Sequence, residues 1–397
     1  MLRCLCLLLF FPCTAIAQFP PPPLAEQYLH QGHHAQGILA LEKHLRQQPG
    51  DDQARFGLGI LRLTRGVERL CQSFYTYGLR NKGTGMLFIR IPIPNNPDPQ
   101  PVSYLQFRNI FVELQRDLMD CEHTLAEIKD DQVKLPLTLA HIKLDIDGNG
   151  EATDSFLDIL HRLLGNRLEL LSKNPHFRVH FDRGDVAWLR AYCHLLTAML
   201  DVYLAVDTES EFYFFAKDYF PRIKPVLSEA EEKQLRDKGT LNSSTVRFQE
   251  KDRLSSFRHH MIAVCQLNRE TWRYIRAETD DDYEWLPHPK QTGVFDMPVR
   301  ENMISGWLGM MSDLEELLEG KTVIPLDFIS GKSEYGLNFK AFLEDPPQQF
   351  DFWKVIQQGP ADKYLVKGGK PFEINRLLTV LQLFDSPLRM GYMAWFN

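Results

Sequence analysis

Apolar residues along this chain recur mostly at the three- and four-residue spacing of an amphipathic helix. Trp188, Tyr192, Leu195 and Met199, for example, fall on one helical face, with polar residues among the positions between them. The same period predicts amphipathic helices over residues 103–128, 185–205, 253–276 and 298–319. Short strands are predicted at residues 86–91, 135–144, 322–326 and 390–396. No strand–helix alternation suggests a doubly wound sheet, so the pattern predicts a mainly α, multi-helix protein with a few short strands.

Polar residues refine the ends of two of these helices. Asp182 or Asp185 is expected to cap the helix over 185–205, because a carboxylate there accepts hydrogen bonds from free backbone N–H groups. The run Arg183-Gly184-Asp185 also spells an adhesion tripeptide, but at a helix start we interpret it as part of this cap. Gly320 is expected to end the helix over 298–319.

The segment 24–80 resembles a tetratricopeptide repeat. Its matching features are an aromatic, a turn glycine, a small residue at the helix contact and a closing proline, at Tyr28, Gly32, Gly37 and Pro49. A partial second unit follows, with Leu58, Gly59 and Gly66 in corresponding places. Since about three such repeats are needed for stability, we expect this TPR-like segment to dock as a cap on an α-rich main domain, residues 81–397. A protein partner bound through the N-terminal helices is the alternative.

The first residues have the features of a secretory signal peptide. Residues 1–17 combine Arg3, an apolar stretch over 5–11 and the small-residue cleavage site Ala15-Ile16-Ala17. A Pro-rich leader, residues 18–23, follows. No other run of about 18 apolar residues is present, so no integral membrane segment is expected after signal removal. The sequence therefore predicts an exported protein, either periplasmic or secreted.

Export changes how the cysteines are interpreted. Cys71, Cys121, Cys193 and Cys265 remain after removal of the signal. They are too few and too widely spaced to form a disulfide scaffold, although an oxidising compartment permits a bridge. Buried free thiols and a disulfide both stay open at this point.

Composition and charge narrow the class of partner. The chain of 397 residues is 44% hydrophobic and 24% charged, which are ordinary values for a globular protein. Its formal net charge is -7, and no basic stripe interrupts the acidic balance. We therefore expect no nucleic-acid partner.

The most specific motif is an acidic loop, which we define as residues 145–154. Its oxygen-bearing side chains at positions 1, 3, 5, 7, 9 and 10 are Asp145, Asp147, Asn149, Glu151, Thr153 and Asp154. Gly150 occupies position 6, where a calcium-binding loop needs a sharp bend. Because alternate residues of such a loop point inward, the spacing predicts a calcium site, with calcium as the bound cofactor.

The loop departs from the EF-hand pattern at its distal end. Position 12, where an EF-hand has a bidentate Glu, is Phe156, and the nearest downstream carboxylates are Asp154 and Asp158. The entering segment alternates like a strand, whereas an EF-hand begins with a helix. The alternative to calcium binding is an Asx-rich turn that caps the following helix.

Other polar groups indicate less specific chemistry. The acidic run 278–284 favours a solvated loop, with a second cation or pairing to Arg273 and Arg276 as alternatives. His30 and His34 have the spacing of a shared zinc site, but no Glu lies between them as in a zincin motif. His259 and His260 form a second histidine group.

No nucleophile elbow, phosphate loop, dinucleotide fingerprint or kinase motif occurs, and no catalytic residue is identified. Acid pairs such as Asp182 with Asp185 could serve a hydrolase. The whole chain resembles exported bacterial proteins of uncharacterised activity that join a TPR-like helical start to an EF-hand-like DxDGNG loop. The sequence thus predicts an exported calcium-binding protein that acts as an interaction or structural module. Whether it is an enzyme stays open, the alternative being an extracytoplasmic hydrolase with a structural calcium ion.

Overall fold

The computed structural model of the chain describes residues 22–80, 93–159, 174, 176–231, 233–234, 245–295, 298–327, 334–384 and 396. The predicted signal peptide, the predicted strand at 86–91 and nearly all of the predicted strand at 390–396 lie outside these residues. Within them the chain is mainly α-helical with small two- and three-stranded sheets, which confirms the predicted fold class.

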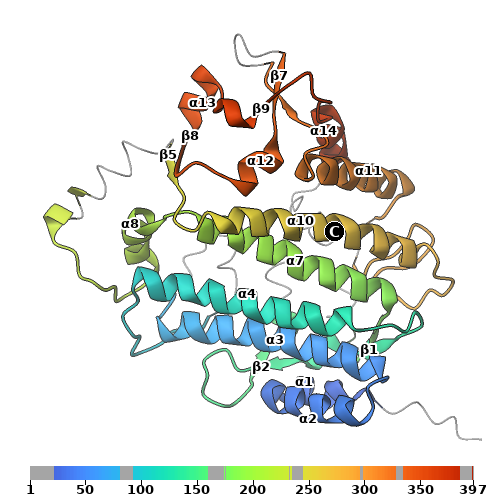
Figure 1. Cartoon of the computed structure of the whole chain (residues 1–397). Helices are drawn as coiled ribbons and strands as arrows, with labels where there is room; N and C mark the ends of the chain where they lie inside the picture. The colour runs from blue at the N-terminus through green and yellow to red at the C-terminus, as the bar shows by residue number, and fades with distance from the viewer. Residues whose placement is uncertain are drawn as a thin grey trace, which may run out of the picture.

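Long helices lie side by side in the order in which they occur along the chain (Figure 1). They are α3 (Asp52–Thr76), α4 (Tyr104–Ala126), α7 (Arg183–Ala205), α10 (Asp252–Ile275) and α11 (Glu301–Leu318). At one end of this stack, α1 (Leu24–Gln31) and α2 (His34–Gln47) cover α3, and at the other end α14 (Ile374–Leu383) covers α11. The four helices predicted from apolar period are α4, α7, α10 and α11, each with bounds within three residues of the prediction.

The strands pair as short antiparallel ribbons at the edges of the stack. β1 (Leu135–Leu137) pairs with β4 (Val179–Phe181), and β2 (Lys143–Leu144) pairs with β3 (Asp154–Ser155) across the acidic loop. β5 (Thr245–Arg247) pairs with β8 (Gln349–Asp351), and β6 (Ile324–Pro325), β7 (Tyr335–Leu337) and β9 (Leu365–Lys367) form a three-stranded sheet. Further helices include α8 (Glu209–Tyr219), α12 (Phe339–Glu344), α13 (Phe352–Gln358), η2 (Leu139–His141) and η4 (Asp362–Tyr364).

A glycine turn joins the first two helices. Gly32 adopts a left-handed conformation, with φ of 68°, and caps α1 through its backbone N–H. Gly37 on α2 lies against Tyr28 so closely that an added Cβ would come within 2.7 Å of the tyrosine Cβ. The helix contact therefore needs a small residue there. The next helix, α3, runs unbroken through Gly59 and Gly66, so these glycines do not mark a second helical turn.

The start of α7 has the cap that the sequence indicates. Asp182 accepts hydrogen bonds from the backbone N–H groups of Gly184 at 2.7 Å and Asp185 at 3.4 Å. Asp185 in turn accepts from the N–H of Asp182 at 2.9 Å, which completes a capping box. The tripeptide at 183–185 is thus the first turn of a helix.

One main hydrophobic core runs along the stack from α1 to Phe396. Leu61 and Leu125 are both fully buried, as α3 and α4 pack together at Gly59. Phe396, near the apolar end of the sequence, is also fully buried and contacts Trp272 with ring centroids 4.6 Å apart. The four cysteines that follow the predicted signal are free and buried.

Within the described ranges, no helix has both the length and the apolar character that crossing a bilayer requires.

Candidate functional site

The acidic loop crosses from β2 to β3 at the α1–α2 end of the stack. The pairing of Leu144 with Asp154 brings its two ends together, so that position 10 of the loop lies beside the residue that precedes position 1. Short strand pairing therefore closes the loop: a strand enters it where an EF-hand has a helix, and a helix begins directly after it at Phe156.

Side-chain oxygens at the first three predicted ligand positions point inward to the backbone of the loop. The Asp145 carboxylate accepts hydrogen bonds from the N–H groups of Gly148, Asn149 and Gly150 at 2.8–3.1 Å. Asp147 accepts from the backbone N–H of Asn149 at 3.1 Å and from its side-chain amide at 3.0 Å. The Asn149 amide oxygen accepts from the N–H of Glu151 at 2.7 Å. This arrangement holds three oxygen-bearing groups in one turn.

Two glycines give the loop its curvature. Gly148 and Gly150 have φ of 73° and 91°, a region of backbone space that other L-residues rarely adopt. The glycine that the sequence places at position 6 therefore has the conformational role expected of it.

The loop is fixed to α3 by two buried or half-buried polar side chains. Glu68, which is only 2% exposed, accepts a hydrogen bond from the N–H of Asp145 at 2.8 Å. Gln72 donates its side-chain amide to the carbonyl of Asp145 at 2.8 Å. On the opposite side Ala152 packs against Gly32, where an added Cβ would lie 1.9 Å from the Ala152 Cβ. The first half of the loop is thus tied to α3 and the second half to the α1–α2 turn.

The loop gathers negative charge. Burial raises the pKa of Asp154, and the carboxylates of Asp147, Asp145 and Asp158 add to the rise because like charges disfavour ionisation. Within the described part of the chain, no lysine or arginine forms an ion pair with the loop acids. The local charge is therefore balanced only by backbone N–H groups.

The loop residues supply the type of ligand that a hard cation prefers, but the distal ligand position is not filled. Carboxylate and amide oxygens from Asp145, Asp147 and Asn149 are the ligand type that calcium prefers. Glu151 and Thr153 are exposed, so neither is fixed as a ligand by packing. Phe156, at position 12, packs its side chain against the core, and Asp154 is the acid that the strand pairing brings to the mouth of the loop. The donor set is that of a loop site without the distal bidentate carboxylate.

A second acidic site lies where the start of α7 meets the segment that follows the end of α10. We call Asp182, Glu278 and Glu284 the acidic cluster, since one carboxylate oxygen of each lies within 4.8 Å of the other two. Asp182 caps α7, while the two glutamates come from the segment that follows α10. The sequence indicated the run 278–284 and the Asp182 cap separately. No local spacing joins them, because they meet only where α7 and α10 pack.

Burial is the main cause of unusual ionisation in this cluster. It raises the pKa of Glu278 to about 8, with the Asp182 carboxylate the next largest cause. It raises the pKa of Glu284 to about 7, and the charge of Asp182 again adds to it. The pKa of Asp185, beneath them, is raised well above its ordinary value by burial and by Asp182. The cluster therefore holds protons that isolated carboxylates would release.

The alternative in which Arg273 and Arg276 pair with the acidic run 278–284 is wrong, because the two arginines have other partners. Arg276 forms an ion pair with Glu301, and Arg273 lies over the ring of Tyr274 at 4.1 Å from its centroid. Lys134 supplies the positive charge instead, through ion pairs with Asp280 and Asp282. The charge of Lys134 also acts on Asp182 and Glu284 of the acidic cluster.

The histidines considered for zinc have separate partners. His30 donates a hydrogen bond from its Nε2 to the carbonyl oxygen of Thr138 at 3.2 Å. His34 contacts Glu68, with 3.3 Å between its Nδ1 and the carboxylate. The two rings are thus used in holding α1 and α2 to the rest of the fold.

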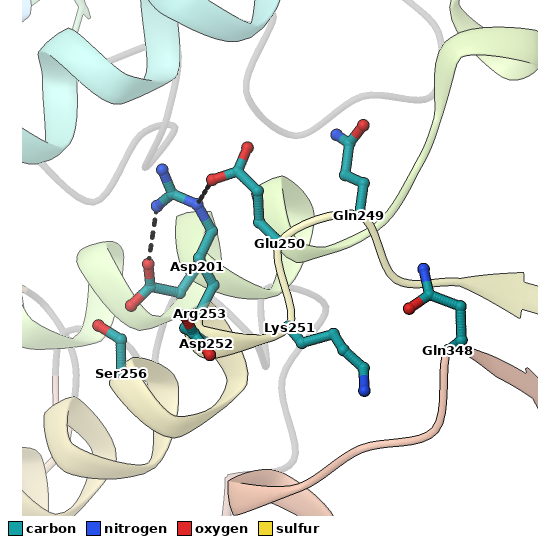
Figure 2. Close-up of a pocket in the computed structure, with 8 residues that line it drawn as sticks. All are labelled: Asp201, Gln249, Glu250, Lys251, Asp252, Arg253, Ser256 and Gln348. Carbon is teal, nitrogen blue, oxygen red and sulfur yellow. Dashed lines mark hydrogen bonds and ion pairs between the residues drawn. The ribbon is translucent and has the colours of Figure 1, made fainter.

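A cavity of about 660 Å³ opens where α10 begins. Figure 2 shows Asp201 of α7, the turn at Gln249 to Lys251, the first residues of α10 and Gln348 around it. Arg253 lies in its wall and bonds both Asp201 and Glu250. The acidic cluster follows the opposite end of α10, so cavity and cluster are separated by most of the length of that helix.

Comparison with known proteins returns no match to this chain among family models, curated proteins or solved structures.

Proposed function

We propose that this chain is an exported calcium-binding helical protein that acts as a structural or interaction module. The observation that carries the proposal is the placement of the Asp145, Asp147 and Asn149 oxygens in one glycine-bent turn, whose acids have no lysine or arginine ion pair among the described residues. A calcium ion would neutralise this charge with oxygen ligands of the preferred kind. The signal-peptide pattern at residues 1–17 supports export, where weak calcium sites fill because the ion is abundant.

The effect of calcium would reach beyond the loop. The Asp145 backbone bonds both Glu68 and Gln72 of α3, and Ala152 contacts the α1–α2 turn. An ion that fixes the loop therefore stabilises the junction of three helices with the β2–β3 ribbon. We infer that calcium orders the N-terminal end of the helix stack, the surface that a protein partner would use.

Thermal unfolding tests this proposal. The mature chain is unfolded in EDTA and then with increasing calcium, with magnesium in a parallel series. Binding to the folded state alone adds about 2.7 kcal/mol to the unfolding free energy when free calcium is 100 times the dissociation constant. Asp147→Ala should abolish that gain, whereas Glu229→Ala, at an exposed glutamate outside the loop, should retain it.

Two results would contradict the proposal: a wild-type chain with no calcium-dependent gain, or an Asp147→Ala variant with the full gain. Either would assign the acidic loop to the Asx-rich turn that its internal hydrogen bonds already form.

The alternative, a hydrolase with structural calcium, requires the acids at 278–284 to share a pocket with His259 or His260. His260 lies in the first half of α10, where it contacts His194 of α7. The C-terminal end of α10, which the acidic run follows, is more than about 20 Å away along the helix axis. The cavity at the start of α10 is lined by neither glutamate of the acidic cluster. We therefore favour the structural or interaction role.

A further inference from the structure

Two histidine rings face each other between the most closely packed helices of the stack. We call His194 of α7 and His260 of α10 the histidine pair. Their Nδ1 atoms are 2.7 Å apart and their ring centroids 5.0 Å apart. Their side chains are 13% and 17% exposed, so the pair is sheltered but open to solvent on one side.

Each ring presents its other nitrogen to a buried carboxylate. The Nε2 of His194 lies 3.6 Å from the Oε1 of Glu122 on α4. The Nε2 of His260 lies 3.9 Å from the Oδ2 of Asp201 on α7. Asp201 is only 2% exposed, and this oxygen is buried without a hydrogen-bond partner. A carboxylate beside Nε2 favours the tautomer in which Nε2 carries the proton.

This tautomer creates a conflict between the rings. If both Nε2 atoms are protonated and both rings are neutral, the two Nδ1 atoms present lone pairs to each other at 2.7 Å. Two arrangements relieve this conflict. One ring can take the Nδ1–H tautomer and donate to the other, at the loss of its Nε2–H toward the carboxylate, or a metal ion can lie between the two nitrogens.

The charged groups around the histidine pair do not repel a cation strongly, because the nearby arginines are paired with carboxylates. Glu122 accepts from Arg190 at 3.0 Å. The Oδ1 of Asp201 accepts from Gln115 at 2.9 Å and from Arg253 at 3.1 Å, and Figure 2 shows the contact with Arg253. His259, next along α10, is exposed. The charged groups that flank the pair on α4, α7 and α10 are thus two carboxylates and two arginines, and each arginine is already paired with one of those carboxylates.

We propose that His194 and His260 bind a divalent transition-metal ion of the imidazole-preferring kind, such as Zn²⁺, through their Nδ1 atoms. Glu122 and Asp201, 3.6 and 3.9 Å from the Nε2 atoms, would accept the Nε2–H groups after a small shift of the rings, which is the outer arrangement that metal-binding histidines generally have. Two nitrogens at about 2.0–2.1 Å from one ion lie about 2.9–3.4 Å apart, so the rings need to separate by a few tenths of an ångström. Water completes the coordination from the open side, because the chain supplies two ligands here.

The test uses the whole mature chain without a histidine tag, which would itself bind the metal. Calcium is kept saturating, and Co²⁺ is titrated while its visible absorption is followed, with Zn²⁺ binding measured by calorimetry. Wild type should bind one ion. His194→Ala and His260→Ala should each lose binding, while His259→Ala, the matched control one position along, should keep it. Asp201→Asn should weaken binding by about 10–100-fold through its effect on the His260 ring.

Circular dichroism and the melting temperature of each metal-free variant establish that it is folded. Asp201→Asn and wild type decide the matter if the alanine variants unfold. The proposal is overturned if wild type binds Co²⁺ no more tightly than the two histidine variants. It is also overturned if nuclear magnetic resonance finds one shared proton in the pair that Zn²⁺ does not displace. Asp147→Ala should bind Zn²⁺ as wild type does, so this site and the calcium loop fail or stand separately.

Discussion

The acidic loop and the acidic cluster both contain several carboxylates, but they satisfy them in opposite ways. In the loop, Asp145, Asp147 and Asp154 lie within ten consecutive residues, and backbone N–H groups donate hydrogen bonds to Asp145 and Asp147. In the cluster, Asp182 meets Glu278 and Glu284 only through helix packing, and burial keeps protons on the glutamates. The comparison teaches that consecutive acids can be satisfied by the backbone of their own turn, whereas acids that meet only through packing are neutralised by the protons they retain.

The largest expected effect comes from separating the loop from the α1–α2 turn. Gly32→Val would force a β-branched residue into a left-handed conformation and against Ala152. We expect a loss of about 2–4 kcal/mol in unfolding free energy, from backbone strain and overpacking together. Urea unfolding in EDTA measures it. We also expect calcium affinity to fall.

Gly368→Val is the matched control, because Gly368 also has positive φ, of 65°, but no neighbouring atom lies within 4 Å of an added Cβ. Equal losses in the two variants would mean that the Ala152 contact contributes nothing to stability, and that the acidic loop is independent of the α1–α2 turn.

The next largest effect should appear in the cluster as a dependence on pH. Because the pKa of Glu278 in the folded state, about 8, is above its unfolded value, the folded state binds more protons and stability falls as pH rises from about 4.5 to about 8. Glu278→Gln removes this charge and keeps an oxygen for Gln291. We expect it to stabilise the protein by about 1–2 kcal/mol at pH 8.5, allowing for solvent screening, and to have little effect at pH 4.5.

Chemical denaturation of both proteins across this pH range measures the difference, with Glu229→Gln as the exposed control. A stabilisation of the same size at both pH values would indicate that packing, and not ionisation, separates the variant from wild type.

The smallest effect concerns the lysine beside the cluster. Lys134 is 46% exposed and pairs with Asp280 and Asp282, so Lys134→Gln should cost less than about 1 kcal/mol. Since Lys134 also lowers the pKa of Glu284, its removal should move the pH midpoint of that carboxyl upward. Titration followed by nuclear magnetic resonance detects the shift.

Lys363→Gln removes a comparable exposed ion pair, with Asp345, far along the chain. It should leave the Glu284 midpoint unchanged. An equal shift in both lysine variants would mean that general charge, and not the local pair, sets the pKa.

The parts of the fold that depend on local pattern were predictable. Apolar period located α4, α7, α10 and α11, and the cap at Asp182 followed from residue type at a helix start. The curvature of the acidic loop followed from Gly150, because glycine tolerates positive φ. These features arise within a few residues, where spacing determines geometry.

Features that depend on which helices touch were not predictable. The sequence grouped His260 with its neighbour His259, whereas packing places it against His194 of another helix. It offered Arg276 as one possible partner of the acidic run, but the side chain reaches Glu301. In each case the partner lies on a different element, and no spacing within one helix carries that information.

The contact between Gly32 and Ala152 has a consequence for how this chain varies among its relatives. Since an added Cβ at position 32 would lie 1.9 Å from the Ala152 methyl, the two positions share one small volume. A bulkier residue at 152 requires the α1–α2 turn to move, and any side chain at 32 requires a smaller residue at 152. Positions 32 and 152 should therefore covary across homologous sequences as directly as two residues of one helix turn.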